Sequence, residues 1–155
     1  MKSAQNIDYL ELTKTLLAEH PVEILLKGMS MFPTLKEGER AVIEQISDLK
    51  TLRKGDIIAF RKDAEIICHR VLKIEETGDK TLITTAGDNN NLSDKAIEFE
   101  DVYGKMISHK TKKGLYQSSG SLKMKFYKVL FINLPWITKK FYKVIQKLKK
   151  LIKKQ

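Results

Sequence analysis

The chain has 155 residues, of which 42% are hydrophobic and 31% charged, which suits one domain, or one domain with an appendage, with a modest core and a soluble surface. A single cysteine, Cys68, excludes an intrachain disulfide and argues against a disulfide-stapled secreted domain. The formal net charge of +10 is uneven, because residues 122–155 hold 11 lysines and no acidic residue, leaving 18 basic and 19 acidic side chains elsewhere.

Residues 1–21 form the first predicted segment, which is helical. Asp8 suits an N-cap with Glu11 three residues later, leucines follow at positions 10, 12, 16 and 17, and Pro21 ends the pattern. The first eight residues contain no apolar run, so we expect no signal peptide. No stretch of the chain reaches the roughly 20 apolar residues that span a bilayer, so no transmembrane helix is predicted.

Residues 22–110 form the second predicted segment, a body rich in strands. Turn clusters such as those at residues 36–39, 76–79 and 87–91 separate the short β-rich runs. Six runs at this spacing favour a mainly β fold, an antiparallel, closed or half-closed barrel-like sheet. The predicted strands cover residues 22–27, 40–46, 56–61, 66–74, 81–85 and 102–110.

A serine follows the first of these strands, in the run Lys-Gly-Met-Ser-Met-Phe-Pro-Thr-Leu at residues 27–35. Gly28 permits close backbone approach, and Pro33 restricts the backbone just beyond the serine. Such a turn can present the hydroxyl and backbone N–H of Ser30 to a substrate carbonyl. A strand followed by a turn with an incidental serine is the alternative reading.

A histidine lies in the predicted strand at residues 66–74. Alternation puts Ile67, His69, Val71 and Lys73 on one face, and Cys68 with Arg70 on the other. An imidazole between two apolar neighbours favours the neutral form that a general base needs. The alternative is an ordinary half-buried strand histidine.

The run Gly-Asp-Asn-Asn-Asn-Leu-Ser-Asp at residues 87–94 supplies two carboxylates, Asp88 and Asp94. Asn and Asp at this density build loops through hydrogen bonds from side chain to backbone. A carboxylate here is also suited to fix the tautomer of an imidazole, the third role in Ser-His-Asp catalysis. Both interpretations remain open from these residues alone.

Taken in order, these motifs resemble a known family. Four motifs carry this resemblance: Gly-x-Ser-Met-x-Pro-Thr-Leu from Gly28, Lys-Gly-Asp-Ile-Ile from Lys54, His-Arg-Val from His69, and Gly-Asp-Asn-Asn followed by Asp94. The chain looks like a type I signal peptidase, within a superfamily that includes LexA-like self-cleaving regulators. Bacterial members typically have lysine where this chain has His69. The histidine is similar to the archaeal and endoplasmic-reticulum type.

The resemblance implies a serine endopeptidase that cleaves a preprotein or precursor peptide after small residues. Ser30 would be the nucleophile and His69 the general base, with Asp94, or else Asp88, orienting the imidazole; Asp94 is favoured. The resemblance implies no cofactor and no metal. The predicted oxyanion and substrate-binding group consists of Gly28, Met29, Met31 and Pro33, with the Ser30 backbone N–H.

The remaining residues are predicted to form a linker, 111–121, and a basic amphipathic tail, 122–155. Phe141, Val144, Ile145, Leu148 and Ile152 fall on one helical stripe, with lysines off it and Trp136 before it. This pattern suits an anionic membrane surface, and the lysine excess favours peripheral attachment at the cytoplasmic face. A helix packed on its own domain is the alternative.

Two other functions compete with the peptidase hypothesis. One is a non-catalytic peptide-binding or LexA-like regulatory module of the same fold. The other is nucleic-acid binding through the basic tail, which we do not expect, because residues 1–21 leave too little room for a helix-turn-helix. The sequence makes no prediction about oligomeric state.

Overall fold

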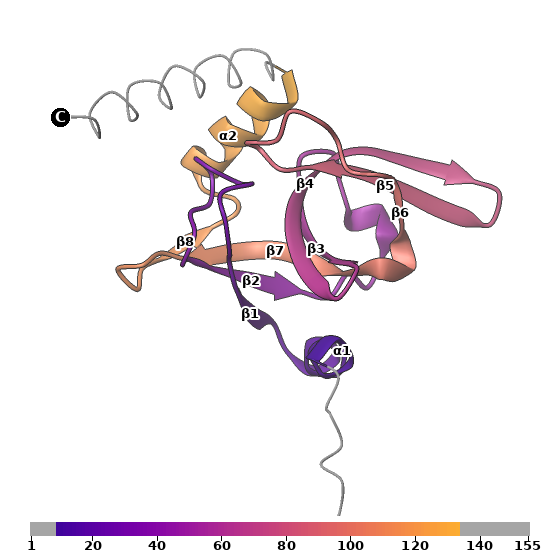
Figure 1. Cartoon of the computed structure of the whole chain (residues 1–155), viewed down its shortest axis with the longest axis horizontal. Coiled ribbons are helices and arrows are strands. Elements are labelled where there is room, and N and C mark those ends of the chain that lie inside the picture. The colour runs from indigo at the N-terminus through magenta and orange to yellow at the C-terminus, as the bar shows by residue number, and fades with distance from the viewer. Residues whose placement is uncertain (1–8, 134–155) are drawn as a thin grey trace, which may run out of the picture.

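The computed structural model describes residues 9–133, which form a mainly β body with a helix at each end (Figure 1). The longest strand, β4, forms a hairpin with β5 that projects from the body. The helices are α1 (Tyr9–Glu19) and α2 (Leu122–Asn133), with short 3-10 turns at Leu49–Thr51 and Phe99–Asp101. The strands are β1 (Val22–Leu25), β2 (Arg40–Glu44), β3 (Ile57–Lys62), β4 (Glu65–Thr77), β5 (Lys80–Ala86), β6 (Ile97–Glu98), β7 (Val102–Lys110) and β8 (Tyr116–Ser118).

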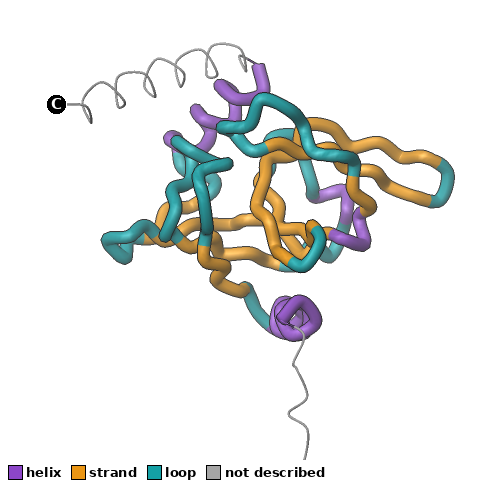
Figure 2. The backbone as a smooth tube through the Cα atoms, viewed as in Figure 1, coloured by secondary structure: helices purple, strands orange, loops and turns teal. Residues whose placement is uncertain are grey.

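The eight strands form one antiparallel sheet in the order β1-β2-β7-β3-β4-β5-β6, with β8 paired to β7. The sheet is strongly curled (Figure 2), but β1 and β6 do not pair, so it stays open. The mainly β prediction and all six predicted strands are confirmed. The strands β6 and β8 were not predicted, because two or three residues are too few to show an alternating pattern. Strand β8 lies within residues 111–121, the predicted linker.

Helix α1 packs on one side of the sheet, and only a narrow stripe of its side chains is buried there. Leu10, Thr13 and Leu17 are buried at i, i+3 and i+7, whereas Leu12 stays 43% exposed. The leucine pattern therefore predicted the helix correctly but placed one leucine on the wrong face. The proposed N-cap, Asp8, lies outside the described residues.

Alternating side chains of β3 and β4 divide the core into two clusters. Ile57, Ala59 and Cys68 join one cluster together with Met31 from the turn after β1. Ile58, Phe60 and Val71 join the other cluster, on the opposite face of the sheet. The pairing of β4 with β5 shifts between Val71 and Lys73, and Ile74 rather than Lys73 packs with the cluster of Val71. The bulge therefore breaks the simple alternation predicted for Lys73.

Helix α2 packs against the body through Met124 and Phe131, both buried. The outward side of the same helix carries exposed apolar side chains at Leu122, Phe126 and Val129. Within residues 9–133, no helix is long and apolar enough to cross a membrane. The predicted stripe from Phe141 to Ile152, and Trp136, lie outside the described residues.

Candidate active site

Ser30 lies in a compact turn that follows β1, which we call the serine turn (residues 28–35). Gly28 enters it with φ of +72°, in the left-handed region that glycine adopts without strain. Inside the turn, the N–H of Phe32 donates to the carbonyl of Met29 at 3.1 Å, and the N–H of Leu35 donates to the carbonyl of Met31 at 2.9 Å. Ser30 itself is half-buried, so the residue lies within this turn and remains partly exposed to solvent.

The loop after β5, residues 87–94, closes on the serine turn. The N–H of Asn89 donates to the carbonyl of Ser30 at 2.7 Å, and its side-chain amide donates to the carbonyl of Met29 at 3.0 Å. A Cβ atom on Gly87 would lie 2.6 Å from the carbonyl oxygen of Ser30, closer than real Cβ atoms come. Glycine at this position is therefore what lets the two loops meet.

His69, on β4, is buried at 3% exposure and is held by the end of the same loop. Nδ1 of His69 lies 2.6 Å from Oδ2 of Asp94, and Oγ1 of Thr85 donates to the same oxygen at 2.8 Å. Nζ of Lys62 lies 3.2 Å from the other oxygen, Oδ1. The ring of Phe60 packs edge-on against the imidazole, with centroids 6.0 Å apart. Thr85, Lys62 and Phe60 thus contact the pair formed by His69 and Asp94.

Opposing effects set the pKa of the Asp94 carboxyl. Burial acts to raise this pKa, but the hydrogen bond and charge of His69, with hydrogen bonds from Thr85 and Lys62, outweigh it. The net effect holds the pKa below its ordinary value. Asp94 is therefore a carboxylate at neutral pH, available to accept a hydrogen bond from Nδ1–H.

Asp88 has different partners from Asp94. Nε and Nη2 of Arg70 each donate to it at 2.7 Å, one to each carboxylate oxygen, and Oγ1 of Thr34 donates to Oδ2 at 2.5 Å. Arg70, Thr34 and Asp88 are all buried, at 2%, 2% and 8% exposure. Asp88 thus ties the serine turn to β4 and has no recorded contact with His69.

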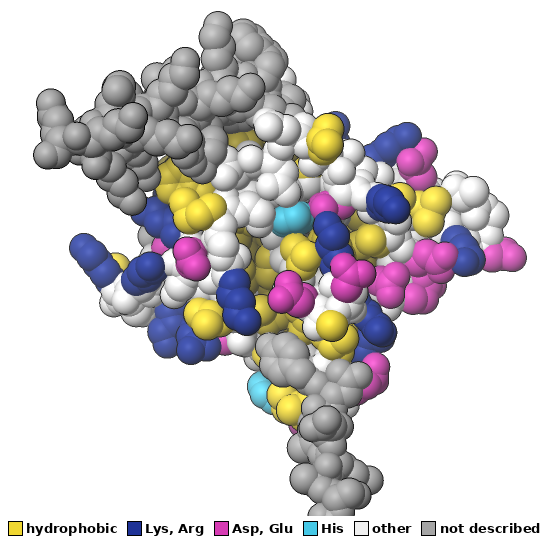
Figure 3. Space-filling model, in the orientation of Figure 1, with side chains coloured by type: hydrophobic (Ala, Val, Ile, Leu, Met, Phe, Trp, Pro, Cys, Tyr) yellow, Lys and Arg dark blue, Asp and Glu magenta, His cyan; other side chains and the backbone are white. Residues whose placement is uncertain are grey.

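A groove of about 700 Å³ runs between the serine turn and β4. Ser30 and His69 both line it, between residues that continue β1 and the start of β4. Figure 3 shows hydrophobic side chains in a hollow on this face, beside a histidine. Of the predicted binding group, Gly28 and Met31 line the groove, whereas Met29 and Pro33 lie outside its lining. Its apolar walls include Ile24, Leu26, Met31, Leu35, Ile66 and Cys68.

Three partners in these networks were absent from the sequence-based prediction. Thr85 and Lys62 contact Asp94, and Thr34 contacts Asp88. Thr34 belongs to the Gly-x-Ser-Met-x-Pro-Thr-Leu motif, and Thr85 lies two residues before the Gly-Asp-Asn-Asn run, so both carry a usable signal. Lys62 carries no such signal, because it comes from a distant part of the sequence in an ordinary strand.

Other chemistries find less support in this part of the molecule. Burial raises the pKa of the Cys68 thiol to about 12, so this cysteine in the groove wall is not a thiolate at neutral pH. Within residues 9–133, no three His, Cys, Asp or Glu side chains gather in a way that would hold a metal ion. The hydroxyl of Ser30 is thus the better candidate nucleophile in the groove.

Comparison with known proteins identifies the relatives of this chain. A family model described as Peptidase S24-like matches residues 1–107. The chain is 41% identical to signal peptidase I W of Bacillus subtilis (strain 168) over 78 residues, which are 50% of this chain and 40% of that protein. It is 30% identical over 100 residues to the signal peptidase complex catalytic subunit of Metarhizium robertsii, covering 57% of each chain. The chain spans about half the length of these curated relatives, and the matches confirm the resemblance found in the motifs.

Proposed function

The chain belongs to the Peptidase S24-like family, and from this premise we propose that it is a serine endopeptidase of the signal peptidase type. Ser30 is the nucleophile, His69 the general base and Asp94 the residue that orients the base. The observation that carries this proposal is the 2.6 Å contact between Nδ1 of His69 and Oδ2 of Asp94, together with the groove that both His69 and Ser30 line.

The proposed reaction follows from this geometry. A carboxylate that accepts a hydrogen bond from Nδ1–H leaves Nε2 as the nitrogen that takes the proton of the Ser30 hydroxyl. The serine oxygen then attacks the scissile carbonyl, and the backbone N–H of Ser30 stabilises the oxyanion that forms. His69 afterwards returns the proton to the leaving amine, and a water molecule then hydrolyses the ester on Ser30, which releases the acid product and restores the hydroxyl. Asp88 supports this arrangement from a distance, by holding the serine turn through Thr34.

The proposed substrate is a preprotein or precursor peptide with small residues before the cut. An extended peptide can lie along the groove between residues 24–28 and 64–69, both of which line it. Buried Met31, Leu35 and Cys68 form part of an apolar wall, which suits small apolar side chains of a substrate. The names of the relatives, both signal peptidases, support this substrate class.

We also propose that residues 122–155 attach the enzyme to an anionic membrane surface. The exposed apolar side of α2 and the 11 lysines of this segment support the proposal. The excess of lysine favours the cytoplasmic face. In this proposal residues 22–110 are the catalytic domain, and residues 1–21 and 111–121 are accessory segments.

Turnover of a peptide with alanines at the first and third positions before the cut tests the proposed chemistry. Ser30→Ala loses cleavage by about 10³-fold or more while the thermal midpoint stays near that of the wild type, because one oxygen is removed. A serine-reactive fluorophosphonate, read out by mass spectrometry, labels the Ser30 peptide of the wild type only. Cleavage by Ser30→Ala at the wild-type rate would overturn the assignment.

Two substitutions test the base. His69→Ala removes the proton acceptor, and His69→Lys copies the residue that bacterial signal peptidases carry at this place. Both lose most activity, because a lysine serves as a base at neutral pH only when its environment lowers its pKa, and Asp94 beside it acts in the opposite direction. Full activity in His69→Lys would show that the carboxylate network is dispensable.

A further inference from the structure

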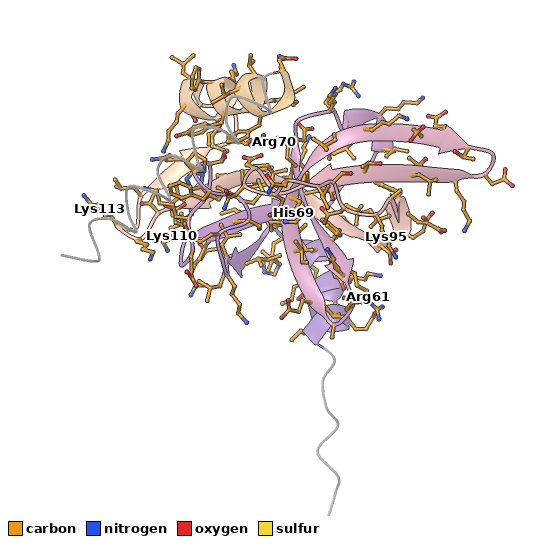
Figure 4. All side chains as sticks on the ribbon, turned by 45° about the horizontal axis from the view of Figure 1, so that its top comes forward. Arg61, His69, Arg70, Lys95, Lys110 and Lys113 are labelled. Carbon is orange, nitrogen blue, oxygen red and sulfur yellow. The ribbon has the colours of Figure 1, made fainter. Side chains whose placement is uncertain are left out.

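The inner side of α2 lies directly on the residues that support the proposed active site. Gly55, with φ of +89°, lies under the helix, and a Cβ there would come within 2.5 Å of Cε of Lys128. The carbonyl of Gly55 accepts a hydrogen bond from Nη1 of Arg70 at 2.8 Å. The ring of Phe131, also on α2, covers the guanidinium of Arg70, with Cζ 5.8 Å from the ring centroid. Figure 4 shows Arg70 on the side of β4 nearer to α2 than His69.

Arg70 connects this helix to the serine turn through two further contacts. Its guanidinium holds Asp88 by two hydrogen bonds of 2.7 Å, and Asp88 accepts a hydrogen bond from Thr34 within the turn. The residue after Asp88, Asn89, donates its N–H to the carbonyl of Ser30. A chain of contacts, buried from Phe131 through Arg70 to Asp88, therefore continues through Asn89 to the backbone of Ser30.

We propose that Phe131 is a positioning residue for Ser30, acting through Arg70 and Asp88. The aromatic face stabilises the guanidinium and keeps water from a buried ion pair, where hydrogen bonds and charges interact most strongly. The pair is then held in one geometry, and both loops that it joins keep their mutual position. This inference rests on the proposed role of Ser30 and gives α2 a role in the chemistry beyond attachment.

Another α2 contact does not serve the same purpose. Nζ of Lys128 lies 2.9 Å from Oδ1 of Asp56, and Asp56 accepts hydrogen bonds from the N–H of Arg53 and not from Arg70. This ion pair is partly exposed, so it contributes little to stability. Lys128 therefore helps to hold α2 on the body without a hydrogen bond to the Arg70–Asp88 pair.

The test uses the full chain and three substitutions. Phe131→Leu keeps an apolar side chain but removes the ring from Arg70, whereas Phe131→Tyr keeps the ring. Phe126→Leu is the matched control, because it makes the same change on the same helix at a side chain that is 63% exposed. For each protein, kcat and KM are measured with a soluble peptide, and hydrogen exchange is measured at the amide of Asn89.

The expected result is a loss of about tenfold in kcat for Phe131→Leu with KM nearly unchanged, since a buried cation–π contact of this kind supports roughly that factor. The Asn89 amide exchanges faster by a similar factor. Phe131→Tyr restores both quantities, and Phe126→Leu changes neither.

Unchanged kcat and unchanged Asn89 exchange in Phe131→Leu, with only a lower thermal midpoint, would overturn the inference and leave Phe131 as a packing residue. Failure of the proposed function is distinguishable from this outcome. In that case the wild type cleaves no peptide, yet Asn89 exchange still reports whether Phe131 controls the loop.

Discussion

Asp94 lies 2.6 Å from Nδ1 of His69, whereas Asp88, in the same loop, lies 2.7 Å from two nitrogens of Arg70. Asp94 sits beside the groove and also contacts the half-exposed Lys62. Asp88 is enclosed, with its side chain 1% exposed. We therefore expect the two carboxylates of this loop to have different roles: Asp94 acts in catalysis, and Asp88 stabilises the fold.

Substituting the two aspartates separates these consequences. Asp94→Asn keeps the shape of the side chain but cannot hold His69 as a carboxylate does, so we expect kcat to fall by about 10²–10⁴ with little change in stability. Asp88→Asn leaves the Arg70 charge buried without its partner, which costs about 3–5 kcal/mol of the free energy of unfolding. Urea unfolding and peptide turnover measure the two effects. Similar stability losses in both variants would contradict the division of roles.

Gly87→Ala tests the close approach of the two loops. The added Cβ would lie 2.6 Å from the carbonyl of Ser30, so the loop has to move and the hydrogen bond from Asn89 is weakened. We expect a loss of about 1–3 kcal/mol in stability and a larger proportional loss of cleavage. Gly120→Ala is the control, because its Cβ would meet only the hydroxyl of Ser118 at 3.5 Å. Wild-type cleavage by Gly87→Ala would argue against a fixed serine turn.

His109 makes the stability of the protein depend on pH. Burial lowers the pKa of His109 below the ordinary value of 6.5. The negative charge of nearby Glu39 acts to raise this pKa, and the positive charge of Lys123 acts to lower it. Because the unfolded chain binds the proton more readily than the folded one, stability is greatest above pH 6.5 and falls as the pH drops from there through the lowered pKa. We expect the thermal midpoint to decrease between pH 7 and pH 5.

His109→Gln should flatten that pH dependence, since glutamine does not titrate. His20→Gln is the matched control, because it makes the same replacement at an exposed histidine directly after α1. Calorimetry in buffers of constant ionic strength gives the slope. A His109→Gln protein with the full wild-type dependence would assign the effect to another group.

Vesicle flotation tests the proposed membrane attachment, and the structure sets the place of truncation. A chain that ends at Gly120 would remove buried Met124 and Phe131 from the body, and with Phe131 the ring over Arg70, so it would change the body as well as the basic tail. A chain that ends at Asn133 keeps α2 and loses eight lysines. Because each lysine near an anionic surface contributes about 1 kcal/mol, we expect the full chain to bind phosphatidylglycerol vesicles at least about 100-fold more tightly, with a strong salt dependence. Equal binding by both chains would contradict attachment through residues 134–155.

The sequence by itself determined the strands and the candidate groups of the site. The predicted strands are those with β-branched residues bounded by turn clusters, and such patterns depend only on local backbone preference and on alternation. Ser30, His69 and Asp94 were identified because each lies in a short motif whose residue types are tied to one chemistry. The sequence also favoured Asp94 over Asp88 as the partner of His69, through the resemblance and not through geometry.

Only the tertiary structure decided which side chains meet. His69 and Asp94 are brought together by the pairing of β4 with β5, and Lys62 reaches the same carboxylate because β3 pairs with β4. The bulge beyond Val71 and the burial of Phe131 against Arg70 likewise depend on packing between segments far apart in the chain. Local propensity carries no information about such contacts, because their energy exists only when distant elements come together and exclude water.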